Sequence, residues 1–297
     1  MRVELPPTYA QVVIIGGGIV GCSVAYHLTQ LGWKDVVLLE QKTLAGGTSW
    51  HAAGLVTQLR SSRTLVDIAR YGVELYPLLE SKTGVSTGFR QTGSITVARS
   101  IGRMDELRKT ISLAHCFGVE IEEISLRKVG EMLPLIKKDD LVGAVHIPND
   151  GQTIPTATAY ALAEGARMGE ATLLENVKVT GILQRDGVVR GVSTEQGDIK
   201  CEKVVNCGGM WAREIGRMCN VSVPLHAAEH MYLVTNSMNV PYDMPSIRDP
   251  DGHIYFRRDI EETGAMLMGG FEPVAKPWGM NGIPADYNFS LLEPDWE

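Results

Sequence analysis

The order of apolar, glycine and polar positions at the start of the chain predicts a strand, a tight turn and a helix. An apolar run at 12–15 leads into glycines at 16–18, and the residues from 19 to 28 suit a helix. A short apolar run bounded by glycines is typical of a buried strand. A second apolar run at 36–39 ends on Glu40 and predicts the next strand.

The rest of the chain alternates between helical and strand-like patterns. Helical spacing of apolar residues is found at 64–79, 104–117, 125–133, 156–168 and 211–218. Strand-like runs are found at 93–98, 119–124, 171–175, 179–183, 188–192, 203–207, 230–234 and 254–257. Elements of a nucleotide-binding fold therefore fall at 11–80 and 151–220, and mixed β elements at 81–150 and 221–297. The fold class predicted is α/β (α+β), with a discontinuous Rossmann-like domain interleaved with a domain built on a mixed β-sheet.

The glycine turn is the first feature that indicates a chemistry. Gly16, Gly18 and Gly21 fit the G-x-G-x-x-G pattern between a strand and a helix, where the glycines serve the tight turn, a bound pyrophosphate and helix packing. Glu40 follows Gly21 by 19 residues, close to the ~20 residues at which an acid reaches the ribose hydroxyls. This favours FAD or NAD over NADP and does not choose between the first two. A turn that serves only packing is the alternative.

Composition narrows the class of protein and of partner. The 297 residues are 44% hydrophobic and 21% charged, as expected for one large or two moderate globular domains. A net charge of −7, with no run of Lys or Arg, argues against a nucleic-acid partner. No apolar run approaches the ~18 residues of a membrane span, and no signal or transit segment is visible. The five cysteines are scattered, so free thiols and no metal site are expected.

The segment 41–55 is a loop of small residues and hydroxyls that continues directly from the second strand. Its glycines, Gly46, Gly47 and Gly54, keep side chains out of the way. The loop is therefore suited to follow a cofactor closely.

Seven stretches of the sequence together carry a family resemblance. They are IIGGGIVG at 14–21, LLE at 38–40, GGTSWHAAGL at 46–55, VVNCGGMWA at 204–212, VPLHAAEHMYLVT at 223–235, DGHIYFRR at 251–258 and EPDWE at 293–297. On them the chain resembles the D-amino-acid-oxidase-like amine dehydrogenases, specifically sarcosine and dimethylglycine dehydrogenases, over essentially its whole length. The glycine fingerprint is common to many folds, whereas T-x-W-H-x-A-G-L in this place is specific. The resemblance implies a FAD-binding domain interleaved with a substrate domain, and oxidation of an N-methyl amine by hydride transfer to flavin.

The resemblance also implies the positions that bind the cofactor. The matching residues are Gly16, Gly18, Gly21, Glu40, Gly47, Thr48, Ser49, His51, Gly54, Leu55, Val179, Gly208 and Gly209. His51 matches the histidine that bonds covalently to the flavin 8α-methyl group, and a neutral imidazole nitrogen is a competent nucleophile for that carbon. A histidine that only hydrogen-bonds within the loop is the alternative.

His230 and Tyr255 match positions that line the substrate face of the flavin in the resembling enzymes, and both are expected to be catalytic. Histidine titrates near neutrality and can manage the proton of a substrate amine. A tyrosine hydroxyl can orient the substrate. The alternatives are a strand histidine bonded to the backbone and a core tyrosine. Arg257 and Arg258 are weaker candidates for a substrate carboxylate.

Further expectations follow from the resemblance. Family members continue beyond residue 297, so the chain looks like an N-terminal piece that lacks a flavin-contacting segment and any tetrahydrofolate-binding module; the stretch 290–297 looks like the start of a helix. A small N-methyl amino acid and an electron acceptor such as an electron-transfer flavoprotein are the implied partners. The implied location is the mitochondrial matrix in a eukaryote, with the targeting segment absent here, or the cytoplasm in a bacterium.

Two rival functions stay open. The chain is also similar to the regulatory subunit of pyruvate dehydrogenase phosphatase, a non-catalytic flavoprotein-like relative that lacks the flavin-linking histidine. His51 therefore favours an enzyme. A nicotinamide dehydrogenase would explain the glycine turn but leaves the loop at 46–55 without a purpose.

Overall fold

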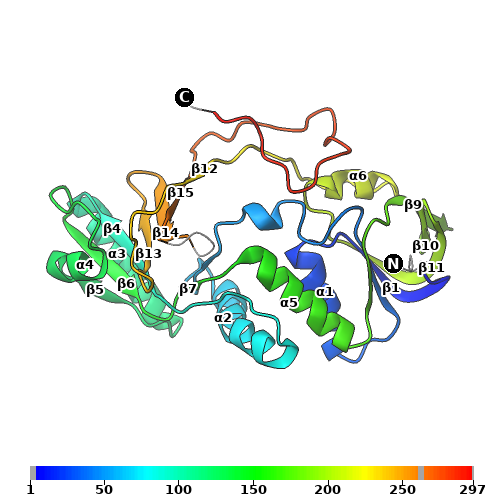
Figure 1. Ribbon diagram of the computed structural model, residues 1–297, viewed down its shortest axis with the longest axis horizontal. Coiled ribbons are helices and arrows are strands. Elements are labelled where there is room, and N and C mark those ends of the chain that lie inside the picture. The colour runs from blue at the N-terminus through cyan, green and yellow to red at the C-terminus, as the bar shows by residue number, and fades with distance from the viewer. Residues whose placement is uncertain (1–4, 260–263, 296–297) are drawn as a thin grey trace.

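The computed structural model describes residues 5–259 and 264–295, and its two main sheets lie at opposite ends of the molecule (Figure 1). The six-stranded sheet has the order β8-β2-β1-β11-β10-β9. Its strands are β1 (Tyr9–Ile15), β2 (Val36–Leu39), β8 (Thr172–Leu174), β9 (Val179–Arg185), β10 (Val188–Thr194) and β11 (Gly197–Asn206). The first three and β11 run parallel, whereas β10 pairs antiparallel with both β9 and β11.

Helices cover both faces of this sheet, which explains why β1 and β2 are continuous apolar runs. One core joins these strands to α1 (Ile19–Gln30), α2 (Arg63–Thr83) and α5 (Pro155–Met168). The other face packs against Ile215 of the short helix α6 (Ala212–Arg217). Small residues let α1 and α5 approach closely, since a Cβ on Gly165 would lie 2.7 Å from the ring of Tyr26.

The seven-stranded sheet has the order β12-β15-β14-β13-β4-β6-β5. Its strands are β4 (Ser94–Ala98), β5 (Glu122–Ile124), β6 (Gly143–Ile147), β12 (Tyr232–Val234), β13 (Ser246–Asp249), β14 (Ile254–Arg258) and β15 (Met266–Gly270). The helix α4 (Leu126–Met132) packs on one face through Val129, and α3 (Ile101–Cys116) packs on the other. A two-stranded pair, β3 (Leu55–Val56) and β7 (Gly151–Gln152), lies between the large sheets.

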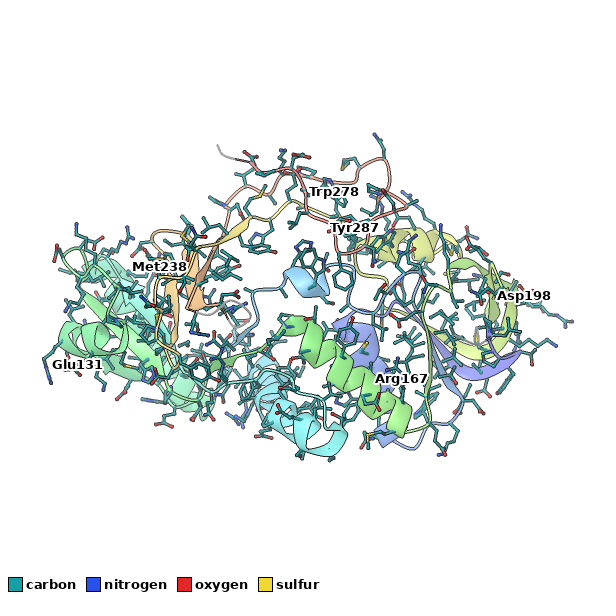
Figure 2. The ribbon with its side chains drawn as sticks, in the orientation of Figure 1. Glu131, Arg167, Asp198, Met238, Trp278 and Tyr287 are labelled. Atoms are coloured by element: carbon teal, nitrogen blue, oxygen red, sulfur yellow. The ribbon has the colours of Figure 1, made fainter. Side chains whose placement is uncertain are left out.

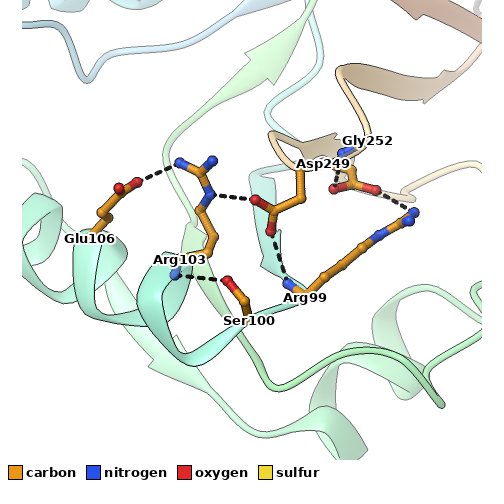
Figure 3. Close-up of polar contacts among 7 residues, drawn as sticks. Arg99, Ser100, Arg103, Glu106, Asp249 and Gly252 are labelled. Atoms are coloured by element: carbon orange, nitrogen blue, oxygen red, sulfur yellow. Dashed lines mark hydrogen bonds and ion pairs between the residues drawn. The ribbon is translucent and has the colours of Figure 1, made fainter.

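The turn between β13 and β14 is tied to the start of α3 by charged side chains (Figure 3). Asp249 accepts a hydrogen bond from the Gly252 backbone and pairs with Arg99 at 2.5 Å. Asp251 accepts from the backbone of Arg99 and pairs with Arg103 at 2.9 Å. These bonds fix the β13–β14 hairpin on its neighbour β4.

The α/β class and every helix expected from spacing are confirmed, but several strands and the end of the chain differ. The strand expected at 93–98 is β4, in which Ser94 and Ile95 are both buried because α3 and α4 cover opposite faces of the sheet. The strands expected at 119–124 and 230–234 are shorter, and β6, β13 and β15 were not expected. Residues 290–295 form no helix, and the last two residues lie outside the described part.

Candidate functional site

The glycine turn lies at the carboxyl ends of β1 and β11, where the order of strands changes direction. Open α/β sheets bind their ligands at such a switch point. Gly16 has φ 109°, and a Cβ there would lie 2.4 Å from the carbonyl oxygen of Cys207. A Cβ on Gly21 would lie 1.9 Å from the carbonyl oxygen of Gly16. Both positions therefore require glycine.

The amino end of α1 faces the loop that follows β2. Gly18 is the N-cap residue and supplies no side chain to the free N–H groups. Instead, Ser49 accepts a hydrogen bond from the Ile19 N–H at 2.9 Å. The loop hydroxyl thus lies at the positive end of the helix, where a phosphate is stabilised by the same donors.

Glu40 follows β2 and points back toward the glycine turn. Its two carboxylate oxygens accept the N–H groups of Gly17 at 2.7 Å and Lys42 at 2.8 Å. Burial raises the pKa of Glu40, although these backbone donors oppose the rise. Together with the three glycines, this acid fits the adenosine and pyrophosphate half of a dinucleotide.

The other loop residues expected to bind the cofactor lie along the same path. Gly47 and Thr48 precede a 3-10 turn (Ser49–His51). Gly54 has φ 68°, and a Cβ there would lie 2.2 Å from the carbonyl oxygen of Thr153. Leu55 begins β3. The loop therefore continues from the glycine turn toward the seven-stranded sheet.

The remaining expected positions lie beyond β11 and at the sheet edge. A Cβ on Gly208 would lie 2.3 Å from the side chain of Ile215, and Gly209 has φ 52°. Val179 begins β9 and is buried. The backbone bond to Glu40 is made by Val177, two residues before Val179: the Val177 N–H donates to the Glu40 carbonyl at 2.9 Å.

His51 is packed rather than free. Its ring lies 3.9 Å from the ring of Trp50 and 6.2 Å from that of Tyr232 on β12. Its Nε2 atom lies 2.9 Å from the Ser290 carbonyl and 3.2 Å from the Tyr287 hydroxyl. Burial lowers the pKa of His51, and the bond to Ser290 opposes this. The ring is therefore neutral at pH 7.

A segment near the end of the described chain crosses the loop at His51 (Figures 1 and 2). The Phe289 N–H donates to the Gly46 carbonyl at 2.8 Å. The Tyr287 ring contacts Trp278 at 5.6 Å and Trp211 at 6.0 Å. The segment packs on this side of the loop.

One face of the seven-stranded sheet is turned toward this loop. Tyr232 and Tyr255 lie directly opposite Gly269 from either side, so all three share that face. A Cβ on Gly269 would lie 2.1 Å from the Tyr255 hydroxyl. Burial raises the pKa of Tyr255, so its hydroxyl stays protonated and can donate.

His230 lies just before β12 with its side chain 53% exposed, and its Nδ1 atom is 2.6 Å from a Glu272 oxygen. Burial opposes ionisation of Glu272, yet the backbone N–H groups of Glu272 and Met231, with His230, lower its pKa. Glu272 also adds to the raised pKa of Tyr255. The structure therefore brings the two expected catalytic residues to one end of the sheet.

Arg257 and Arg258 serve the fold. Both are buried, and Arg257 donates to the carbonyl of Ala53 in the loop and to that of Arg258. Arg258 donates to the carbonyl of Val240 and lies 5.3 Å from the ring of Tyr242. Their guanidinium groups fasten β14 to its neighbours.

Sequence patterns missed several residues of this region. Tyr232, Tyr287 and Ser290 meet at His51 only through the register of the sheet and the path of the chain after β15, and Arg248 lies opposite Tyr255. Tyr232 belongs to the stretch 223–235 that carries part of the family resemblance, and this was its only signal in the sequence. No sequence signal indicated Arg248, because its place opposite Tyr255 depends on strand pairing.

Other features of the described residues lie elsewhere. A cavity of about 330 Å³ is lined by Ile247, Phe256 and their neighbours, on the face of the sheet opposite His51. Within 5–259 and 264–295, no group of three or more His, Cys, Asp or Glu side chains is placed to hold a metal ion. No helix there is long and apolar enough to cross a membrane.

Comparisons with known proteins agree with this geometry. Residues 11–297 match the model of the FAD dependent oxidoreductase family. The chain is 41% identical to the mouse (Mus musculus) mitochondrial pyruvate dehydrogenase phosphatase regulatory subunit, over 98% of this chain and 33% of that protein. It is 39% identical to the 4-methylaminobutanoate oxidase (formaldehyde-forming) of Paenarthrobacter nicotinovorans, over 98% of this chain and 35% of that protein.

Two further likenesses extend the comparison. The chain is 39% identical to human (Homo sapiens) mitochondrial sarcosine dehydrogenase, over 98% of this chain and 32% of that protein. It thus spans about a third of the length of these curated relatives. The crystal structure of L-proline dehydrogenase from P. horikoshii superposes with a TM-score of 0.84 at 26% identity, covering 91% of this chain and 71% of that one.

Proposed function

The chain belongs to the FAD-dependent oxidoreductase family, and from that premise we propose that it oxidises an N-methyl amine such as sarcosine or dimethylglycine. Residues 11–80 and 151–220 form its FAD-binding domain, and 81–150 and 221–297 its substrate domain. Relatives named as sarcosine dehydrogenase and 4-methylaminobutanoate oxidase support this class of substrate. An electron acceptor and, in a eukaryote, a mitochondrial location complete the proposal.

The observation that carries the proposal is the place of His51. A half-buried, neutral imidazole lies in the loop that follows β2 and passes the glycine turn, and its ring lies 6.2 Å from that of Tyr232 on β12. Bound FAD would supply the acceptor for a hydride equivalent from the N-methyl carbon. We assign the covalent flavin link to His51, because a neutral nitrogen in this position is a nucleophile.

The chain's own residues prepare the substrate. His230, oriented by Glu272 at 2.6 Å, takes the proton from the substrate ammonium. The Tyr255 hydroxyl donates a hydrogen bond that orients the substrate. Tyr287 packs beside the His51 ring.

The test uses the full-length protein. Acid precipitation should leave flavin fluorescence with the polypeptide, and anaerobic titration with sarcosine or dimethylglycine should bleach the flavin absorbance. His51→Ala should release the flavin into the supernatant, whereas His115→Ala, an exposed histidine on α3, should not. Protein that binds no flavin and is not bleached would overturn the proposal and favour a non-catalytic regulatory subunit.

A further inference from the structure

The two ring nitrogens of His51 lie in different surroundings. Nε2 is 2.9 Å from the Ser290 carbonyl oxygen and 3.2 Å from the Tyr287 hydroxyl. In the described part of the chain, Nδ1 of this ring makes no hydrogen bond. His27 differs, because its Nδ1 lies 2.7 Å from the Ser23 carbonyl oxygen. His51 therefore offers Nδ1 as its unengaged nitrogen.

The contact with Ser290 decides which nitrogen of His51 carries the proton. A carbonyl oxygen can only accept a hydrogen bond, so the neutral imidazole must have its N–H at Nε2. The same bond acts to raise the pKa of His51 against the effect of burial, as expected of a donated N–H. The lone pair of the neutral ring is therefore on Nδ1.

The Ser290 carbonyl is held in place by bonds around its own turn. The Ser290 hydroxyl accepts a hydrogen bond from the Asn288 N–H at 3.2 Å and donates to the Asn288 carbonyl at 3.3 Å. Between them, the Phe289 N–H donates to the Gly46 carbonyl at 2.8 Å. The acceptor that fixes the His51 tautomer is thus tied to the loop that carries the histidine.

We propose that His51 forms its flavin bond through Nδ1, with the Ser290 carbonyl and the Tyr287 hydroxyl as the groups that position the ring. This rests on the proposed covalent link and specifies its atom. The Nδ1 lone pair bonds to the 8α carbon, and one C–H bond of that carbon breaks. Its electron pair reduces the isoalloxazine ring, which also takes the proton. The imidazole becomes positively charged, and its Nε2–H bond to Ser290 stabilises that charge. Dioxygen, as external oxidant, then removes the two electrons from the ring.

The full-length apoprotein, produced in riboflavin-depleted cells and mixed with FAD, tests the assignment. Samples taken over time are denatured, and the flavin fluorescence left on the polypeptide gives the rate of attachment. The flavin peptide is then cut from protein carrying isotope-labelled histidine. Long-range NMR correlations from the 8α methylene protons identify the bonded nitrogen, and we expect Nδ1. A bond to Nε2, or FAD bound without covalent attachment, would overturn the proposal.

Tyr287→Phe and Ser290→Ala test the positioning role, because they remove the hydroxyl beside Nε2 and the hydroxyl that holds the turn. Each should slow attachment about 2- to 10-fold, the effect of one lost hydrogen bond, while the initial affinity for FAD hardly changes. Tyr71→Phe is the matched control, since it removes a hydroxyl 2.8 Å from Nε2 of His27, and attachment should keep its rate. Equal rates in all variants would overturn the positioning role. Protein with flavin attached through Nδ1 that N-methyl amines never bleach would instead refute the proposed oxidation.

Discussion

Replacing Gly21 by alanine tests whether the glycine turn is shaped by the close approach of α1 to β1. The added Cβ would lie 1.9 Å from the Gly16 carbonyl oxygen, whereas ordinary contact begins at 3.4 Å. The helix and the turn must therefore separate by about 1.5 Å. Alanine gains at most about 1 kcal/mol of helix propensity, and overpacking costs about 1–3 kcal/mol. With the full propensity gain subtracted, we expect a net destabilisation of up to about 2 kcal/mol, and weaker FAD binding.

Gly72 provides the matched control, since it lies inside α2 with no atom within 4 Å of an added Cβ. Gly72→Ala should stabilise the protein by up to about 1 kcal/mol. Thermal unfolding of the apoprotein should show the two variants shifting in opposite directions, by about 2–4 °C per kcal/mol. Titration of the apoprotein with FAD then measures how far the substitution weakens cofactor binding. A Gly21→Ala variant that unfolds at the same temperature as Gly72→Ala and binds FAD normally would refute the steric argument.

Two further predictions concern pH and the β13–β14 turn. Because the pKa of His51 is lowered from 6.5, the unfolded chain binds more protons below that pH. Stability should therefore be full above pH 6.5 and fall on acidification relative to His51→Gln, as urea unfolding at several pH values will show; a relative gain in acid would contradict this. Asp249→Ala, which removes a buried carboxylate bonded to Gly252, should cost about 1–3 kcal/mol. Asp251→Ala should cost less than about 1 kcal/mol, an effect that salt reduces, and equal losses in denaturant unfolding would count against the distinction.

The helices and strands that depend on local sequence signals were the most predictable. The helix at 64–79 is α2 with its ends extended, because apolar spacing and the Ser62 cap are local signals. The strand at 93–98 is present, but its burial on both faces depends on two helices that follow it in sequence. The strand β13 had no local signal in the sequence, because it is only four residues long and has a proline at each end.

The same division holds for the site. The glycine turn, Glu40 and the loop to His51 form one nearly continuous stretch, and the structure gives Gly16 and Gly21 steric reasons to be glycine. The structure argues against Arg257 and Arg258 as ligands of a substrate carboxylate, because both side chains are buried and donate to backbone carbonyls. Exposure and hydrogen bonding decide such roles, and neither is visible in residue types.

The sequence by itself determined the dinucleotide turn, the acid after the second strand and the loop that leads to His51, because each depends on backbone geometry within a few residues. Only the tertiary structure decided what faces that loop. Strand register sets Tyr232, Gly269 and Tyr255 in one row and adds Arg248 beside them. Pairings between strands far apart in sequence depend on packing of the whole sheet, and no local pattern encodes them.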